Sequence, residues 1–172
     1  LVPSPVGMVR RARSFAAFSC SKLEQNRMTS TNEQKGCYEL LDHTADLKIR
    51  VRAKALPTLF ENAGYALFDL ICNISAVQPT GRHQVKVEGA DLEELLVSWL
   101  GELLYLFEVH GLLLRSFSVK SLDGRSLAAE VAGEPYDPNR HQLKVDIKAV
   151  TYHQLEIARV GGEWQTAIVF DI

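Results

Sequence analysis

The sequence has few cysteines and little net charge. Its three cysteines, Cys20, Cys37 and Cys72, include no Cys-x-x-Cys pair, so they are most simply read as free thiols in a reducing compartment. The formal net charge of −2 argues against a nucleic-acid interface spread over the whole surface. A local basic patch stays compatible with it.

The sequence also lacks an apolar run long enough to cross a membrane. Its most apolar stretch, residues 92–114, is interrupted by charged or titratable residues at helical spacing. This pattern indicates an amphipathic helix rather than a membrane span, and we expect no membrane contact. The interrupting residues are Glu93, Glu94, Glu102, Glu108 and His110.

Several common catalytic motifs are missing. The sequence contains no Gly-x-Ser-x-Gly, no glycine-rich phosphate loop followed by Lys-Ser/Thr, and no His-Glu-x-x-His. The Gly161-Gly162 pair predicts a turn, and Cys72 ends a helical apolar stripe, where we expect a packed hydrophobe rather than a nucleophile. With 172 residues, 47% of them hydrophobic, the chain is long enough to bury the core of one domain.

Residues 1–36 differ in composition from the rest of the chain. Three arginines and several serines precede Glu24, the first acidic residue, which is typical of an organellar transit peptide. Because the sequence begins at Leu1, we favour the interpretation that Met28 is the usual start, and expect a cytoplasmic or nuclear protein. This basic and polar extension is expected to be disordered, and residues 37–172 are expected to form the folded domain.

From residue 37 onward, the spacing of apolar residues alternates between the two-residue period of strands and the longer period of helices. The first strand has a basic outer face, and Asp91 with Glu94 forms a capping box before the second helix, which Gly111 ends. Asp123-Gly124 predicts a hairpin, and residues 133–140 a loop. The expected class is α+β, with two helices packed on a largely antiparallel sheet. Helices are predicted over 56–71 and 92–110, and strands over 47–51, 85–87, 112–120, 126–131, 143–149, 153–160 and 164–170.

Acidic residues gather at two points that bound the folded domain. Asp42 and Asp46 share one face of the segment before the first strand if it is extended, and His43 lies between them. Asp171 and the α-carboxylate of Ile172 follow the last strand directly. Such oxygen donors suit Mg²⁺ or Ca²⁺, whereas Zn²⁺ normally recruits Cys or more His.

Each of these residues also has a simpler interpretation. Asp42 is equally well explained as a cap or turn residue that accepts backbone N–H groups, and the end of the chain as an edge strand that stops in solvent. Lys148 and His153 suit a phosphate or an acidic partner, but a solvated strand face accounts for Lys148 as well.

Three segments taken together resemble the archease family. They are YELLDHTAD at 38–46, VDIKAVTYH at 145–153 and VFDI at 169–172, in this order, and the resemblance covers everything except the N-terminal extension. It implies a small α+β fold built from a duplicated strand-helix-strand-strand unit.

The resemblance also implies a role without catalysis by the chain itself. Archeases are protein cofactors of RtcB-type RNA ligases, which join RNA ends in tRNA splicing through a guanylylated histidine of the ligase. The cofactor promotes this guanylylation and supports multiple turnover, with RNA contact that is indirect or weak. Carried over residue by residue, the resemblance implies that the ligands of the family's divalent metal are Asp46, Asp171 and the terminal carboxylate of Ile172. Asp42, Lys148 and His153 match the motifs without an assigned role.

Two other functions are open from the residues alone. A metal-dependent phosphoesterase is disfavoured because only one ion site can be assembled and no base is spaced to activate water. A chaperone, or a modulator of RNA-modifying enzymes, would need an exposed apolar patch, which alternating strands do not predict.

Overall fold

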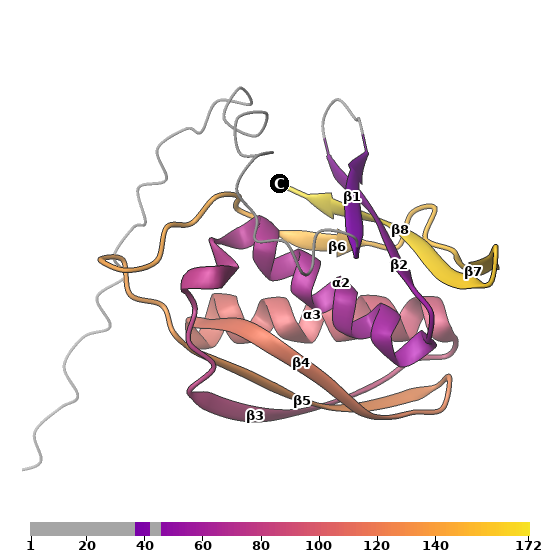
Figure 1. Ribbon diagram of the computed structural model, residues 1–172, viewed down its shortest axis with the longest axis horizontal. Helices are drawn as coiled ribbons and strands as arrows, with labels where there is room; N and C mark the ends of the chain where they lie inside the picture. Colours follow the sequence, from indigo (N-terminus) through magenta and orange to yellow (C-terminus); the bar gives the residue numbers. More distant parts are fainter. Residues whose placement is uncertain (1–36, 42–45) are drawn as a thin grey trace, which may run out of the picture. The chain divides into compact units, whose positions relative to one another are not determined.

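A computed structural model describes residues 37–41 and 46–172 of the chain (Figure 1). The predicted extension 1–36 and two candidate site residues, Asp42 and His43, lie outside the described residues.

The described strands form two antiparallel sheets rather than one. We name each sheet after its central strand. The β8 sheet has the order β1-β2-β8-β6, with β7 also paired to β8, and the β5 sheet has the order β3-β5-β4. The bounds in the first sheet are β1 (Tyr38–Leu41), β2 (Leu47–Ala53), β6 (Ala149–Thr151), β7 (Ile157–Val160) and β8 (Glu163–Asp171), and in the second β3 (Gly81–Glu88), β4 (Leu112–Leu122) and β5 (Ser126–Pro135).

Two helices, α2 (Leu56–Ile71) and α3 (Leu92–His110), lie between the two sheets, and a short 3-10 helix, η2 (Ile74–Ala76), follows α2 (Figure 1). The fully buried Trp99 of α3 donates a hydrogen bond from Nε1 to the carbonyl oxygen of Phe60 in α2, at 2.9 Å. Each helix buries apolar side chains on opposite sides, so the core is continuous across all three layers. The α+β class is confirmed. None of the described helices is both long and apolar enough to cross a membrane.

The two sheets share one topology. The segment β3-α3-β4-β5 folds into a sheet in which the last strand lies between the first two. The segments β2-α2 and β6-β7-β8 together form the other sheet in the same way, with the last strand, β8, between β2 and β6. Along the chain, the segment β3-α3-β4-β5 is inserted between these two segments. Leu47 pairs with Phe170 in one sheet and Gly81 with Gly133 in the other. Asp171 and Glu134, one residue further along β8 and β5, therefore occupy equivalent positions.

The predicted ends of α3 and the predicted hairpin are confirmed. Asp91 accepts a hydrogen bond from the Glu94 amide at 2.8 Å, and Glu94 in turn accepts one from the Ala90 amide. Gly111 ends the helix with a φ of 66°, a left-handed conformation that glycine adopts without strain. In the hairpin, Asp123 accepts backbone bonds from residues 125 and 126.

One predicted strand, 143–149, is wrong over most of its length. Leu143 makes a single bridge to Cys72, and the Lys144 amide donates to the carbonyl oxygen of Ile71, so this segment crosses the end of α2. Its alternating pattern arises because Ile147 is buried in the core while its neighbours face outward. Regular pairing begins only at Ala149. The strand predicted over 153–160 begins at Ile157, and β5 continues to Pro135, into the predicted loop.

Candidate functional site

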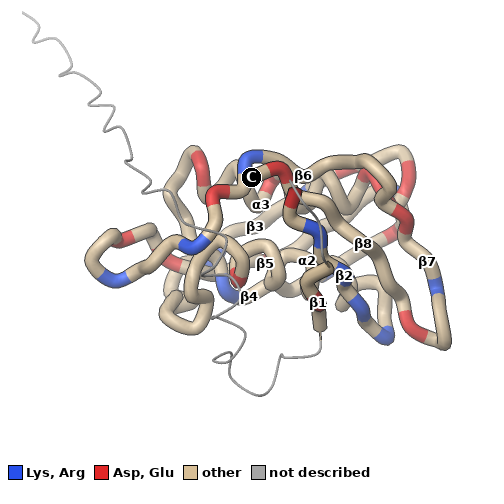
Figure 2. Tube along the Cα trace, turned by 90° about the horizontal axis from the view of Figure 1, so that it is seen from above, with Lys and Arg blue, Asp and Glu red and all other residues tan. Residues whose placement is uncertain are grey.

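The ends of β2 and β8 bring two of the predicted acids to one corner. Because Leu47 pairs with Phe170, the same register places Asp46 opposite Asp171. Both residues are exposed, and Ile172 follows Asp171 directly. We call Asp46, Asp171 and Ile172 the acidic corner, and Figure 2 shows acidic segments beside the C-terminus on this side of the molecule.

Lys148 lies at the same corner. It immediately precedes β6, and its backbone amide donates a hydrogen bond to the carbonyl oxygen of Asp171 at 2.8 Å. This bond fixes the end of β8, while the ammonium group of Lys148 is exposed. Among the residues described, neither Asp46 nor Asp171 has a hydrogen bond or ion pair to its carboxylate. The charge at the corner is therefore uncompensated within that part of the chain.

The donors at the corner suit a hard cation but do not complete a site by themselves. Within the described ranges, no three Asp, Glu, His or Cys side chains gather closely enough to hold a metal ion. Asp46 and Asp171 supply two carboxylates, so a site needs further oxygen donors, such as the α-carboxylate of Ile172 or Asp42. Carboxylate oxygens with open coordination positions fit Mg²⁺ or Ca²⁺ better than Zn²⁺.

His153 does not lie at this corner. It is exposed in the turn between β6 and β7, past the end of β6 that is further from Asp171. The preceding Tyr152 directs its hydroxyl to Asp91, the N-cap of α3, at 3.4 Å. Desolvation and the nearby Asp91 carboxylate raise the pKa of this hydroxyl. The structure therefore brings Lys148 to the acidic corner and leaves His153 elsewhere.

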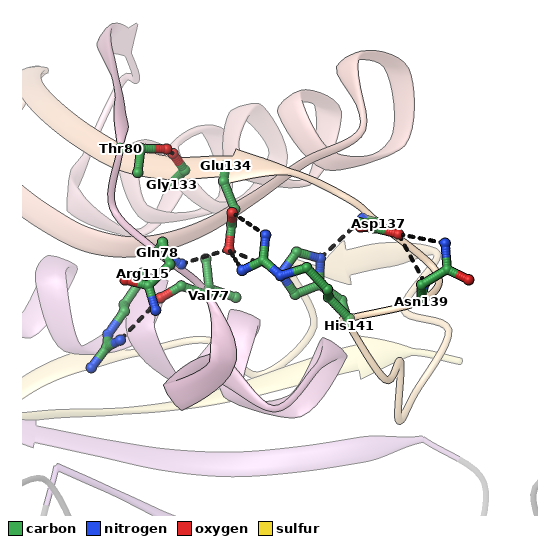
Figure 3. A network of polar contacts seen from close by, with 10 residues as sticks. Val77, Gln78, Thr80, Arg115, Gly133, Glu134, Asp137, Asn139 and His141 are labelled. Carbon is green, nitrogen blue, oxygen red and sulfur yellow. Dashed lines mark hydrogen bonds and ion pairs between the residues drawn. The ribbon is translucent and has the colours of Figure 1, made fainter.

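A second carboxylate centre, which no sequence motif indicated, lies at Glu134 (Figure 3). Arg140 makes two hydrogen bonds to this buried carboxylate, at 2.9 and 3.1 Å, and the Gln78 amide donates a third at 2.7 Å. His141 accepts from the Asp137 amide at Nδ1, so its proton is on Nε2 and is donated to Glu134. The Arg140 bonds and the Gln78 amide together lower the pKa of Glu134 to about 2.

The two described cysteines, Cys37 and Cys72, are free. Cys72 is buried, and its thiol donates to the carbonyl oxygen of Phe68 at 3.3 Å. Burial raises the pKa of Cys72 to about 12, so the thiolate needed for nucleophilic attack is not formed at neutral pH. The expectation of a packed hydrophobe at this position fits these contacts.

Comparison with known proteins decides the family. Residues 38–172 match the model of the Archease protein family (MTH1598/TM1083). The chain belongs to the archease family. The family match includes Asp46, Lys148, Asp171 and Ile172, and it confirms the resemblance seen in the three short motifs.

Two relatives match over nearly their whole length. The chain is 41% identical over 138 residues to protein archease of Methanopyrus kandleri, a match that covers 78% of this chain and 99% of the relative. It is also 41% identical over 139 residues to protein archease of Pyrococcus furiosus, covering 78% and 98%.

Solved structures agree with the fold. The solution structure of Methanobacterium thermoautotrophicum protein 1598 superposes with a TM-score of 0.68 at 29% identity, covering 79% of this chain and 99% of that one. The crystal structure of an archease from Thermotoga maritima gives a TM-score of 0.52 at 20% identity, covering 77% and 94%, and so supports the fold alone.

Proposed function

We propose that this archease is a metal-binding activator of an RtcB-type RNA ligase, which it helps to become guanylylated during tRNA splicing. The observation that carries the proposal is the pair of exposed, uncompensated carboxylates, Asp46 and Asp171, at adjacent ends of β2 and β8. Family membership supplies the connection to the ligase.

Two exposed carboxylates at opposed register positions repel each other and stabilise the fold little. Their placement is therefore better explained by binding than by stability. Asp46 and Asp171 would hold a Mg²⁺ or Ca²⁺ ion, with Ile172 as the predicted third donor. Such an ion supplies positive charge beside the phosphates of GTP when it is bound. Asp171 ends β8 and Asp46 directly precedes β2, so the two paired strands position both carboxylates, which favours precise docking at the ligase.

Lys148 has a separate role in this proposal. Its backbone amide holds the end of β8 through the 2.8 Å bond to the carbonyl oxygen of Asp171, and its side chain is exposed. A cation of this kind attracts the phosphate groups of a nucleotide or of an RNA end. The acidic corner thus offers a metal site, and Lys148 beside the end of β8 offers a phosphate-binding charge, to the mouth of the ligase active site.

The test compares the protein alone with the protein beside its ligase. Purified ligase, GTP and Mg²⁺ are assayed for guanylylation with wild-type protein, with Asp171→Asn and with the matched control Glu88→Gln, an exposed acid on β3. We expect stimulation by the wild type and the control, and none by Asp171→Asn. Phosphoesterase activity of the protein alone would favour an enzyme instead. Absence of any stimulation by the wild type would contradict the proposal.

A further inference from the structure

The outer face of the β8 sheet carries a row of cations. The two described helices, α2 and α3, cover the opposite face of this sheet (Figure 1), and alternate residues of β2 point outward as Lys48, Arg50 and Arg52. Figure 2, which looks onto this side, shows basic segments along β2. We call these three residues the β2 cation stripe.

Only one carboxylate among the described residues compensates the stripe. Glu39 of β1 accepts from Arg50 at 2.5 Å and from Arg52 at 3.1 Å through the same oxygen, Oε1. These side chains are 38–46% exposed, and ion pairs with that exposure stabilise little. Lys48 has no ion pair within the described part of the chain. Two of the three cations thus share one weakly held carboxylate, and the third has none in that part of the chain.

The neighbouring strand supplies no counter-charge. The β8 residues opposite Lys48, Arg50 and Arg52 are Val169, Ala167 and Gln165. Alternate residues on a strand lie about 7 Å apart, so the stripe is a regular row of cations beside an uncharged row of β8 residues. It runs toward the acidic corner, because Lys48 is two residues from Asp46. A polyanion along the stripe would therefore end at that corner.

We propose that the β2 cation stripe binds backbone phosphates of the single-stranded RNA end that the ligase joins. The inference rests on the proposed function, which places the acidic corner at the ligase active site, where the RNA ends meet. Guanidinium groups bind phosphate through paired hydrogen bonds, and rows of cations follow the backbone of single strands.

Two features favour RNA over an acidic protein surface as the occupant. The regular spacing along one extended strand suits a repeating polyanion, and the row leads into the corner that we place beside the reacting RNA ends. Three phosphate contacts give weak and salt-dependent binding on their own. The stripe therefore acts as an added RNA contact within the ligase complex, not as an independent RNA-binding site.

The test uses a matched pair of double variants. Lys48→Gln with Arg52→Gln removes two cations of the stripe. Arg82→Gln with Lys86→Gln removes the residues at equivalent positions on β3, the first strand of the β5 sheet. Circular dichroism verifies that both variants fold. Each is assayed for ligase guanylylation without RNA, for the KM of a single-stranded RNA substrate in ligation, and for RNA binding by fluorescence anisotropy at low salt.

We expect the stripe variant to stimulate guanylylation like the wild type while the KM for RNA rises about tenfold. The slope of log affinity against log salt should fall by about 1.4, since two phosphate contacts are lost. The β3 variant should match the wild type in all three assays.

Two results would overturn the inference. Loss of guanylylation without RNA would show that the stripe contacts the ligase protein, and an unchanged KM and salt slope would show that it contacts nothing. If the wild type itself fails to stimulate guanylylation, the proposed function fails, and anisotropy still decides whether the stripe binds RNA.

Discussion

The ends of β8 and β5 are equivalent places in the two sheets, and their carboxylates are treated in opposite ways. At the end of β5, Glu134 is buried and receives hydrogen bonds from Arg140, His141 and the Gln78 amide. At the end of β8, Asp171 is exposed, and no described residue pairs with its carboxylate. The residue before β3 is Thr80, whereas the residue before β2, the equivalent strand, is the acid Asp46.

This difference shows how one topology serves two purposes. At Glu134, the cation is Arg140 of the chain itself, so the carboxylate ties the loop after β5 to the segment before β3 (Figure 3). At Asp171, a second acid, Asp46, stands nearby, and no cation of the described residues forms an ion pair with either carboxylate. The β5 end is therefore built for stability, and the β8 end is left for an external cation.

Removing the Glu134 carboxylate should produce the largest loss of stability. In Glu134→Ala, the buried His141 and the Gln78 amide lose their acceptor and the Arg140 pair is lost, which costs about 3 kcal/mol of unfolding free energy. Urea denaturation followed by circular dichroism measures the change. A loss below about 0.5 kcal/mol would show that the Glu134 centre is not a structural one.

The Glu134 centre should also make the unfolding free energy depend on pH. Glu134 has a folded pKa of about 2 against an ordinary value of 4.5, so its ionised form is favoured by folding. Its contribution is complete above about pH 4.5 and is lost as the pH falls toward 2. The unfolding free energy of Glu134→Gln should fall less steeply over this window than that of the wild type. Equal slopes in parallel denaturation series would contradict the assignment.

The acids of the β8 end should behave differently. Asp46→Asn and Asp171→Asn each remove one of two neighbouring like charges, so the metal-free protein should keep its stability within about 0.5 kcal/mol or gain slightly. Thermal unfolding in the presence of a chelator measures this. If either variant unfolds, the acid has a structural role like that of Glu134, and the contrast between the two ends disappears.

The smallest effect is expected at Ile172. Ile172→Val keeps a β-branched side chain and the α-carboxylate, so metal affinity should stay within about twofold. A C-terminal tag converts that carboxylate into a neutral amide, and affinity should fall. Calorimetric titration of Mg²⁺ or Ca²⁺ into the C-terminally tagged protein measures this change. The N-terminally tagged protein, titrated in the same way, is the control. Equal affinities would remove the α-carboxylate from the site.

The elements that local chemistry specifies could be predicted from the sequence. The caps of α3 and the Asp123 hairpin depend on side chains within a few residues of each other, and both are confirmed. The chemistry of the acids predicted that one carboxylate of the 42–46 segment joins those at the end of the chain, and the family resemblance singled out Asp46. That Asp46 lies opposite Asp171 follows from strand register, which the sequence does not show.

The features that depend on distant contacts could not be predicted. Glu134 accepts from the Gln78 amide, 56 residues away in sequence, and no local pattern links them. The wrongly predicted strand at 143–149 shows the same limit. An alternating pattern of apolar residues indicates that one side of a segment is buried, but it does not show whether another strand pairs with its backbone. The division into two sheets is likewise set by pairing between strands that are far apart along the chain.

The most direct test of the contrast between the two ends is calorimetric titration of Mg²⁺ and of Ca²⁺ into metal-free protein. Wild type, Asp171→Asn and Glu88→Gln are compared under identical conditions. We predict one binding event in the wild type and in Glu88→Gln, and an affinity at least tenfold lower in Asp171→Asn, because one anionic ligand is lost. Equal affinities in all three proteins would contradict the claim that the β8 end is a cation site.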